Sequence, residues 1–398
     1  MNKIKDELFF KNSIITEIIK FSLEVNRVDF MSRYQEHNNS PSARNLHSAQ
    51  VLFIYKKRIY YYDIFSREIY WVGDDESFAY SEKLYLVGFH QLKNLSRYYG
   101  EFSMYLTLLD GGHLLFNIKN ILRLNEISHR QSVGGLNELS LDNICCDKNI
   151  FTSFILEIDL EQELDYEKEN TLLTRKDDFD SYNYLSGTSI LEQLISVYRN
   201  PPKNNWQDVE QEELKVFCST SLQNRSSCHN MIGNYNRKNL RLEIPLSDVM
   251  QDLKRINQTL LSSNVEVAFL RKLNQDFIEI VKVDEVYQTK GNLSLILNND
   301  HDYFDIESYG GVFVCFGKRS KTLEDGIQSY LLSVSEIMQY LSLYISEAKR
   351  GFRPMKNYDD KYLKQVLRLN KQDDINYIGS ICDNNVNQLN SVIMTEGE

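Results

Sequence analysis

The stretch VLFIYKKRIYYYDI, residues 51–64, indicates a β-hairpin in the first half of the chain. Residues 51–55 and 59–64 are rich in β-branched and aromatic side chains, which favour strands, and the basic residues between them supply the turn. A third run of this kind, IYWVG at residues 69–73, extends the pair into a meander. This region therefore predicts a sheet of sequential antiparallel strands.

A helix is expected on each side of the meander. Before it, residues 12–25 place their isoleucine and leucine side chains on one helical face. After it, residues 104–124 repeat apolar side chains at helical spacing, although Gly111 and Gly112 lie inside that segment. Because a glycine inside a helix costs about 1 kcal/mol relative to alanine, we expect a second backbone or a ligand to pack against this pair. A close helix–helix crossing is the simpler explanation.

The second half of the chain repeats this order of elements. The pattern predicts a helix, four strands, a long amphipathic helix and a short terminal helix, at residues 246–261, 265–270, 277–283, 293–297, 311–316, 325–348 and 358–368. Arg350, Gly351 and Pro354 follow the long helix as its stop. Residues 136–146 are the expected short helix of the first half. The order predicts an α+β pattern used twice, although the two halves are too dissimilar in sequence to identify a repeat.

The length of 398 residues suits two domains of about 200 residues each. Residues 161–187 are charged and weakly patterned, as expected of a surface excursion, and Pro201 with Pro202 is the strongest stop in the chain. We therefore expect one domain over residues 1–190 and a second, more divergent one over residues 205–398.

The composition excludes several classes of protein. With 42% hydrophobic residues, 25 Tyr and 20 Phe, the chain can bury a core and is not a disordered protein. A net charge of -11 argues against a nucleic-acid partner. No apolar run is long enough to span a membrane, and no secretory signal is recognisable at Met1, so a cytoplasmic protein is expected. The six Cys and seven His lack ligand spacing, and no metal site is expected.

Two polar strings are candidates for ligand binding. In SPSARNLH, residues 40–47, small residues beside an asparagine permit the backbone to approach a flat ligand, and a plain helix-to-strand turn is the alternative. In NRSSCH, residues 224–229, an arginine followed by two hydroxyls could bind a phosphate, and an ordinary polar loop is the alternative. The standard nucleotide-binding, zinc-protease and serine-hydrolase motifs are absent.

These strings resemble segments of flavin-dependent nitroreductases, and the closest branch is the SagB/ThcOx-type azoline dehydrogenases of ribosomal-peptide (RiPP) biosynthesis. Residues 40–63 are similar to that branch's P-S-A-G-x-L-H/Y-P segment and the strands after it. Residues 97–117 are similar to its R-Y-x-G-E-R-A-Y-R-x-x-x-L-D-A-G-H-x-x-Q-N segment. Residues 222–231 and 325–369 resemble the opening motif and the closing helices of the wider superfamily.

The resemblance implies an α+β fold of two tandem nitroreductase-like domains, each with a mostly antiparallel sheet flanked by helices, that form a pseudo-dimer within one chain. It also implies FMN, bound non-covalently between the two domains. The flavin ring would be approached by Pro41, Ser42, Ala43 and Asn45. The phosphate would be bound by Arg225, Ser226 and Ser227, with Lys349, Arg350 or Arg353 as the late basic residue. Each half keeps what the other lacks, so we expect one complete site and one inactive site.

The chain departs from the branch at several functional positions. The branch's E-R-A-Y-R is Glu101–Tyr105 here, without the two arginines, and Cys228 stands for the second arginine of the opening motif. The Lys-Tyr pair associated with azoline oxidation has no clear counterpart. Lys93 with Tyr98 or Tyr99 is the nearest candidate for acid–base catalysis, and a packed interface tyrosine is the alternative.

The expected function is therefore an FMN-dependent dehydrogenase that oxidises an azoline in a precursor peptide to a thiazole or oxazole. One alternative is a non-catalytic scaffold subunit of a peptide-modifying oxidase complex, and another is a generic flavin nitroreductase. The expected partners are the precursor peptide and either a second nitroreductase-like chain or a YcaO-type cyclodehydratase, with no nucleic acid and no membrane.

Overall fold

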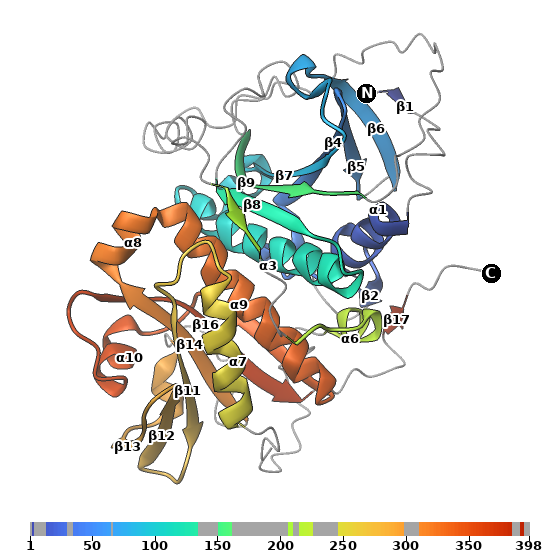
Figure 1. Cartoon of the computed structure of the whole chain (residues 1–398). Coiled ribbons are helices and arrows are strands. Elements are labelled where there is room, and N and C mark those ends of the chain that lie inside the picture. Colours follow the sequence, from blue (N-terminus) through green and yellow to red (C-terminus); the bar gives the residue numbers. More distant parts are fainter. Residues whose placement is uncertain are drawn as a thin grey trace. The chain divides into compact units, whose positions relative to one another are not determined.

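The chain forms two compact units, which are described here one at a time. In the computed structural model, unit 1 comprises Met1–Asn26 and Asn38–Glu212, and unit 2 comprises Arg27–His37 and Glu213–Glu398 (Figure 1). The structure describes residues 2–3, 13–29, 35–64, 67–133, 150–160, 206–209, 215–225, 246–297, 310–383 and 391–393. The expected boundary at Pro201 and Pro202, the expected helix 136–146 and the expected excursion 161–187 lie outside them.

Unit 1 is built on an antiparallel sheet that contains the predicted meander. Its main strands in sheet order are β6 (Glu68–Asp74), β5 (Arg58–Asp63), β4 (Ala49–Tyr55), β7 (Leu84–Gln91), β9 (Ile150–Ile158) and β8 (His129–Val133). The short strands β1 (Asn2–Lys3) and β10 (Gln207–Asp208) extend the two edges. The β4–β5 hairpin pairs Tyr55 with Arg58, and Lys56 in its turn has a φ of 54°. The prediction of this hairpin is confirmed.

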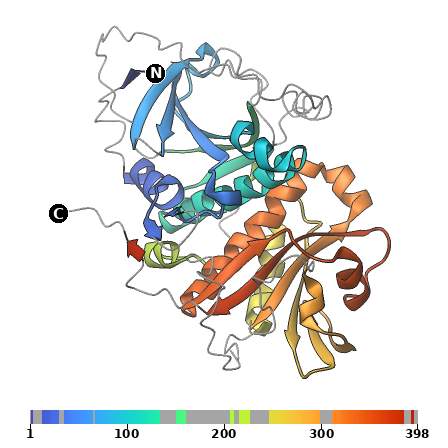
Figure 2. The same cartoon turned by 180° about the vertical axis from the view of Figure 1, so that it is seen from behind.

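One long helix fills the core of unit 1 beside the sheet (Figure 2). This helix, α3 (Phe102–Leu124), contacts β4 and β7, and it is buried from Ser103 to Leu122 except at Tyr105, which is half-buried. The other helices are α1 (Ser13–Ile18), the π-helix η2 (Ile19–Leu23) that continues it, η4 (Glu76–Phe78) and α2 (Lys93–Tyr99). The predicted helices at 12–25 and 104–124 are thus confirmed.

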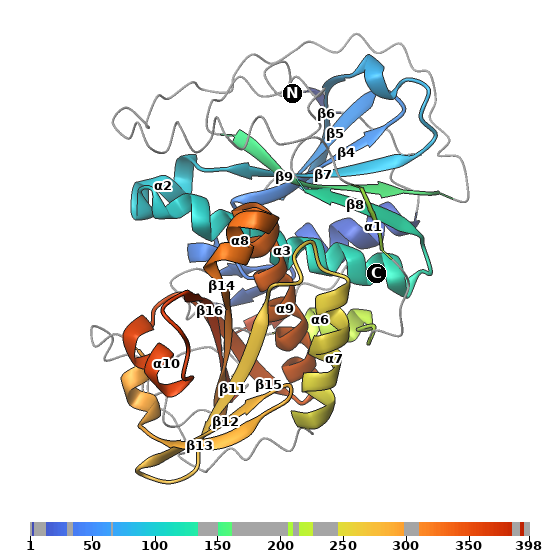
Figure 3. The ribbon, with the colours of Figure 1, turned by 60° about the vertical axis from the view of Figure 1, so that its left-hand side comes forward.

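Unit 2 contains a second antiparallel sheet (Figure 3). Its strands in sheet order are β13 (Val286–Lys290), β12 (Phe277–Lys282), β11 (Glu266–Lys272), β14 (Gly311–Lys318), β16 (Asp373–Asp383) and β15 (Arg350–Met355). Alternate residues of β11 and β14 face opposite sides. Those on one side pack with α10 (Asp360–Val366) and η5 (Leu293–Ile296), whereas α7 (Leu246–Gln258) and α9 (Ile327–Glu347) cover the other.

The remaining elements of unit 2 are short. They are α6 (Ser219–Asn224), α8 (Arg319–Asp325) and a three-stranded sheet of β17 (Ser391–Ile393), β2 (Arg27–Asp29) and β3 (Glu36–His37). The last two strands come from the first half of the chain, so a segment that the sequence assigned to the first domain packs within unit 2.

The two main sheets have the same strand order. The series β6-β5-β4-β7-β9-β8 in unit 1 corresponds, strand by strand, to β13-β12-β11-β14-β16-β15 in unit 2. In both units the meander follows a helix, and a short and a long helix follow the fourth strand of the chain order. The predicted α+β fold with mostly antiparallel sheets flanked by helices is therefore confirmed.

One predicted element has the wrong type. Residues 293–297, predicted as a strand, form the 3-10 helix η5, because the side chain of Asn292 accepts a hydrogen bond from the N–H of Ser294 and caps a tight turn. Leu293 and Ile296 then point into the core, so their apolar character reflects burial in a turn.

The predicted stop after α9 has a second role. Residues Arg350–Met355 also form β15, which lies at the edge of the sheet, where a proline such as Pro354 is tolerated. Within the part of the chain that the structure describes, no helix is both long and apolar enough to cross a membrane.

Candidate functional site

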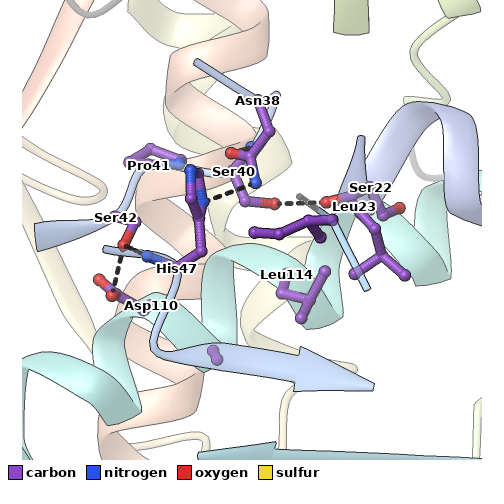
Figure 4. A pocket seen from close by; sticks show the side chains of 11 residues that line it. Ser22, Leu23, Asn38, Ser40, Pro41, Ser42, His47, Asp110 and Leu114 are labelled. Carbon is purple, nitrogen blue, oxygen red and sulfur yellow. Dashed lines mark hydrogen bonds between the residues drawn. The ribbon is translucent and has the colours of Figure 1, made fainter. Parts of the chain in front are cut away.

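The loop that leads into β4 has an unusual backbone. We call residues 40–48 the SPSA loop; it contains the 3-10 turn Ala43–Asn45 and lies beside α3 (Figure 4). Arg44, Asn45 and His47 have φ values of 53°, 56° and 47°. Non-glycine residues adopt positive φ rarely, and three of them within four positions require contacts that hold the loop in place.

Those contacts converge on one carboxylate of α3. The Asp110 Oδ2 accepts hydrogen bonds from the hydroxyls of Ser42 and Ser48, both at 2.9 Å, and the N–H of Ala43 lies 3.2 Å from Oδ1. The Ser42 hydroxyl oxygen in turn accepts from the backbone N–H of His47 at 2.9 Å. Burial raises the pKa of Asp110 to about 7, against the opposing effect of these hydrogen bonds.

A row of buried polar groups continues from Asp110 into the sheet. The Thr107 hydroxyl donates to the Ser48 hydroxyl at 2.8 Å, and the two ring nitrogens of His90 contact Thr107 at 3.0 Å and Ser153 at 2.5 Å. Burial lowers the pKa of His90 to about 3, so its ring is neutral at physiological pH. This row of hydrogen bonds therefore connects the SPSA loop to β7 and β9, and His90 adds no charge to that of Asp110 near pH 7.

The start of the loop borders a small polar pocket in unit 1 (Figure 4). The side chain of Asn38 lies 3.0 Å from Nδ1 of His47 and accepts the N–H of Ser40, and Asn117 donates to the Ser40 hydroxyl at 2.9 Å. Asp110 and Ser42 also line the pocket, opposite apolar residues such as Leu23 and Leu114, and its free volume of about 10 Å³ is no larger than a water molecule needs. Burial lowers the pKa of His47 to about 4, so this wall is neutral near pH 7.

The residues that were predicted to approach a flavin ring lie in one loop of the structure. Pro41, Ser42 and Ala43 lie in the SPSA loop beside Asp110, and the N–H of Asn45 closes the 3-10 turn by donating to the Ser42 carbonyl at 3.0 Å. Asp110 itself was missed as a site residue. Its sequence signal is that it is the one acidic residue of α3, next to two glycines.

The predicted acid–base candidates lie on α2. Lys93 begins that helix and Tyr98 and Tyr99 end it, so about 7 Å of helix rise separates the lysine from the nearer tyrosine. The guanidinium of Arg44 stacks over the ring of Tyr98 at 4.3 Å and lies 5.5 Å from that of Tyr99. Tyr98 is 57% exposed, so the loop and these tyrosines share one accessible surface of unit 1.

The predicted phosphate-side residues belong to unit 2. Arg225 is buried at the end of α6, and Arg27 of β2 donates to its carbonyl oxygen at 3.2 Å. Burial, and then the positive charge of Arg27, lower the pKa of Arg225 to about 9. Arg350 and Arg353 lie on β15 and are half-buried, whereas Ser226 and Ser227 are outside the described residues. Arg27 was missed because a lone arginine far from Arg225 in the sequence carries no motif.

Among the described residues, no group of histidine, cysteine and acidic side chains is arranged to hold a metal ion. The geometry is thus that of a polar binding surface in unit 1 and a buried cationic pair in unit 2.

Comparisons with known proteins give a structural match alone. A scan against models of protein families and a search of curated proteins both give no match. Among solved structures, the chain is similar to a protein from Anabaena variabilis that is assigned as a nitroreductase, with a TM-score of 0.70 and 13% identity. The match covers 96% of this chain and 92% of that one. The chain therefore has the fold of a nitroreductase over both units.

Two further matches are partial. A nitroreductase family protein from Clostridium novyi matches with a TM-score of 0.29 and 10% identity over 38% of this chain and 80% of that chain. An FMN-dependent nitroreductase from Clostridium difficile matches with a TM-score of 0.26 and 13% identity over 39% of this chain and 85% of that chain. Scores this low add nothing to the argument on the fold.

Proposed function

We propose that the protein is an FMN-dependent oxidoreductase with one flavin site, to which unit 1 contributes the ring side and unit 2 the phosphate side. The observation that carries the proposal is the SPSA loop, a preorganised polar turn on a nitroreductase fold. When bound, FMN would supply a hydride acceptor, and the chain's own residues would bind and orient the reactants.

The residues of the SPSA loop fit a flat ring. Pro41 and Ala43 have small side chains that let the ring approach the backbone, and the amide of Asn45 can face both donor and acceptor atoms of a ring edge. Asp110 and its hydrogen bonds hold the turn in place before any ligand arrives. Less conformational freedom is then lost on binding, which favours affinity.

The cationic pair of unit 2 fits a phosphate. Arg27 and Arg225 bring two positive charges into one buried region, and the pKa of Arg225 is lowered by that proximity as well as by burial. An anion between them would relieve the repulsion, and a guanidinium can bind phosphate through two parallel hydrogen bonds. Arg350 or Arg353 of β15 would be the late basic residue, with Ser226 and Ser227 as further ligands.

For the reaction, we propose the oxidation of a thiazoline or oxazoline in a precursor peptide to the azole. The substrate would lose a hydride to the cofactor and a proton from the neighbouring carbon to a base, and aromatisation would drive the step. Tyr98 or Tyr99 is the candidate for that base because both lie against Arg44 of the SPSA loop, and Lys93, at the start of the same helix, is the second candidate. A YcaO-type cyclodehydratase would supply the azoline.

A scaffold role is the second candidate, and a specific observation favours it. Phe102 and Tyr105 stand where the related branch has arginines, and their rings stack at 5.4 Å with Phe102 40% exposed. An exposed phenylalanine backed by a half-buried tyrosine suits the docking of a peptide or of a second nitroreductase-like chain. Generic nitroreductase activity on small electrophiles is the remaining alternative.

The visible spectrum and the released cofactor of the purified protein test the proposal. We expect a yellow protein with one FMN per chain, and formation of an azole, detected as the loss of two hydrogens, when an azoline peptide is supplied. A colourless protein that cannot be loaded with FMN would exclude the oxidoreductase and leave the scaffold. FMN without peptide oxidation would favour the generic reductase.

Two variants test the site itself. Arg225→Met removes a buried charge at similar volume, and Asn45→Gly removes the amide while tolerating the φ of 56° at that position. We expect each to weaken FMN binding about tenfold or more. Arg319→Met is the control, because Arg319 is an exposed arginine of unit 2 paired with Asp374. FMN affinities unchanged in both variants would rule out this site.

A further inference from the structure

We infer that Asp110 is the positioning residue of the SPSA loop: it sets the loop conformation on which the ring side of the proposed flavin site depends. The inference rests on the proposed function for its consequence in binding, although the role in the loop stands on the geometry of unit 1 alone.

All the groups around the carboxylate are donors. The hydroxyls of Ser42 and Ser48 and the N–H of Ala43 come from both ends of the loop's tight turn and meet on the two oxygens of Asp110. One side chain of α3 thus fixes three points of the loop. A carboxylate is the side chain that can accept all three, since its two oxygens offer about four lone-pair positions.

The loop needs such an anchor because its backbone is strained. The backbone angles of Arg44, Asn45 and His47 lie in the left-handed region. The 3-10 turn Ala43–Asn45 therefore departs from regular helical geometry at Arg44. Arg44 is further held by stacking on Tyr98. Without the bonds from Ser42, Ala43 and Ser48, these residues would relax to negative φ and the loop would lose its shape.

The row of hydroxyls behind Asp110 has a direction. Because the Thr107 hydroxyl donates to Ser48, it accepts from Nδ1–H of His90, and Nε2 of His90 then accepts from the Ser153 hydroxyl. Every proton in the row points toward Asp110, where the row ends on an acceptor. The Ser48 hydroxyl is therefore committed to Asp110, which reinforces the anchor from the side of the sheet.

Asp110 also couples the loop to pH. Several titratable and charged groups lie on the loop and on the elements packed with α3: His47 and Arg44 in the loop, His90 on β7, His113, Lys119 and Arg123 on α3, Lys93 and Arg97 on α2, Lys20 on η2, and Glu17 on α1, which accepts a hydrogen bond from Asn125 at the far end of α3. His47 and His90 are neutral near pH 7, because burial lowers the pKa of each. Burial of Asp110 under the loop outweighs its hydrogen bonds and raises its pKa. Opening the loop would admit water and lower that pKa, so rising pH favours opening.

Hydrogen exchange of the SPSA loop in the full-length protein tests this role. Asp110→Asn keeps the size of the side chain but replaces one acceptor oxygen with an NH₂ group, which cannot accept hydrogen bonds from Ser42, Ala43 or Ser48. We therefore expect the protection of the backbone amides of residues 42–48 against exchange to fall about tenfold. Ser42→Ala removes one of the three donors and should have a smaller effect. In the unmodified protein, protection corrected for intrinsic exchange should decrease from about pH 4 to about pH 7 and level off above it, and Asp110→Asn should abolish that dependence.

The control is Asp252→Asn, the same chemical change at an aspartate of α7 that accepts the Tyr340 hydroxyl at 2.7 Å. It should leave the protection and pH profile of residues 42–48 unchanged. If Asp110→Asn also leaves both unchanged, the inference is wrong.

FMN titration of the same variants separates this inference from the proposed function. Weaker FMN binding by Asp110→Asn, with Asp252→Asn unaffected, supports both. If neither the unmodified protein nor any variant binds FMN, the proposed function is wrong. The exchange data still test the role of Asp110 in the loop. If FMN binds all variants equally although loop protection is lost, the loop is not the ring side of the site, and the consequence inferred for binding is wrong.

Discussion

The two units follow one strand order, yet the turn that leads into the first strand of the meander is built differently in each. In unit 1 this turn is the SPSA loop, and a buried carboxylate of α3 anchors it. In unit 2 the turn before β11 is short. There the N–H of Ser262 donates to the neutral hydroxyl of Ser333 on α9 at 2.9 Å. The framework is shared, and the polar anchor differs.

The difference lies in how each turn is held against its helix. In unit 2 the two hydrogen bonds go to two different side chains, because the Ser262 hydroxyl also donates to the Asp325 carboxylate at 2.7 Å. In unit 1 the loop of left-handed residues places three donors on the single carboxylate of Asp110. That unit 1 contributes the ring side of a flavin site stays a proposal, and the SPSA loop is the feature of unit 1 on which it rests.

The largest expected effect concerns the shared framework. Gly88 of β7 lies under the ring of Phe154, and Gly379 of β16 lies under that of Phe352; a Cβ at these positions would approach the rings to 2.2 and 2.0 Å. We expect Gly88→Ala and Gly379→Ala each to lower the free energy of unfolding by about 3 kcal/mol, through overpacking. Chemical denaturation followed by circular dichroism measures both.

Gly73→Ala is the matched control, because a Cβ on that strand residue would meet nothing within 4 Å. It should change stability by less than about 0.5 kcal/mol. If only one of the two buried glycines tolerates alanine, the two sheets are less alike in packing than their strand order suggests.

A smaller effect distinguishes the units by the sign of their response to pH. Asp110 has a folded pKa raised to about 7, so the folded state retains a proton that the unfolded state has lost, and stability falls as pH rises from about 4 to about 7. Lys356 of unit 2 has a pKa lowered to about 8 by burial, so stability rises as pH rises from about 8 to about 10.

Within its pH window, each group should change the free energy of unfolding by about 1 kcal/mol per pH unit. Denaturation midpoints across pH, compared with those of Asp110→Asn and Lys356→Met, isolate the two groups. If the stability of a variant depends on pH as strongly as that of the unmodified protein, another residue causes the dependence.

The smallest expected effect compares the two anchors directly. Ser48→Ala removes a hydrogen bond to a charged acceptor and should cost about 2 kcal/mol, whereas Ser333→Ala removes a bond between neutral groups and should cost about 1 kcal/mol. Thermal unfolding gives the two values. Equal losses would mean that the charge of Asp110 adds nothing to the anchoring of the loop.

Much of the framework could be predicted because its signals are local. The hairpin of β4 and β5 and the helices α3, α7 and α9 follow from the spacing of apolar and β-branched residues. The strands β7 and β9 were not predicted, although both are largely buried inside the sheet of unit 1, because a buried strand lacks the polar–apolar alternation that marks an exposed one. Of the candidate site, the strings around Ser42 and Arg225 were found, but the residues that support them, Asp110 and Arg27, were not.

By itself, the amino-acid sequence determined the α+β pattern and its use in two halves, since periodicity and turn chemistry act over a few residues. Only the tertiary structure decided that Arg27 packs within unit 2 beside Arg225, and that Asp110 lies under the SPSA loop, 62 to 68 positions from the serines it binds. The physical reason is that a buried charge or a strained turn is stabilised by whichever partners the fold brings to it, and such partners leave no mark in the local sequence.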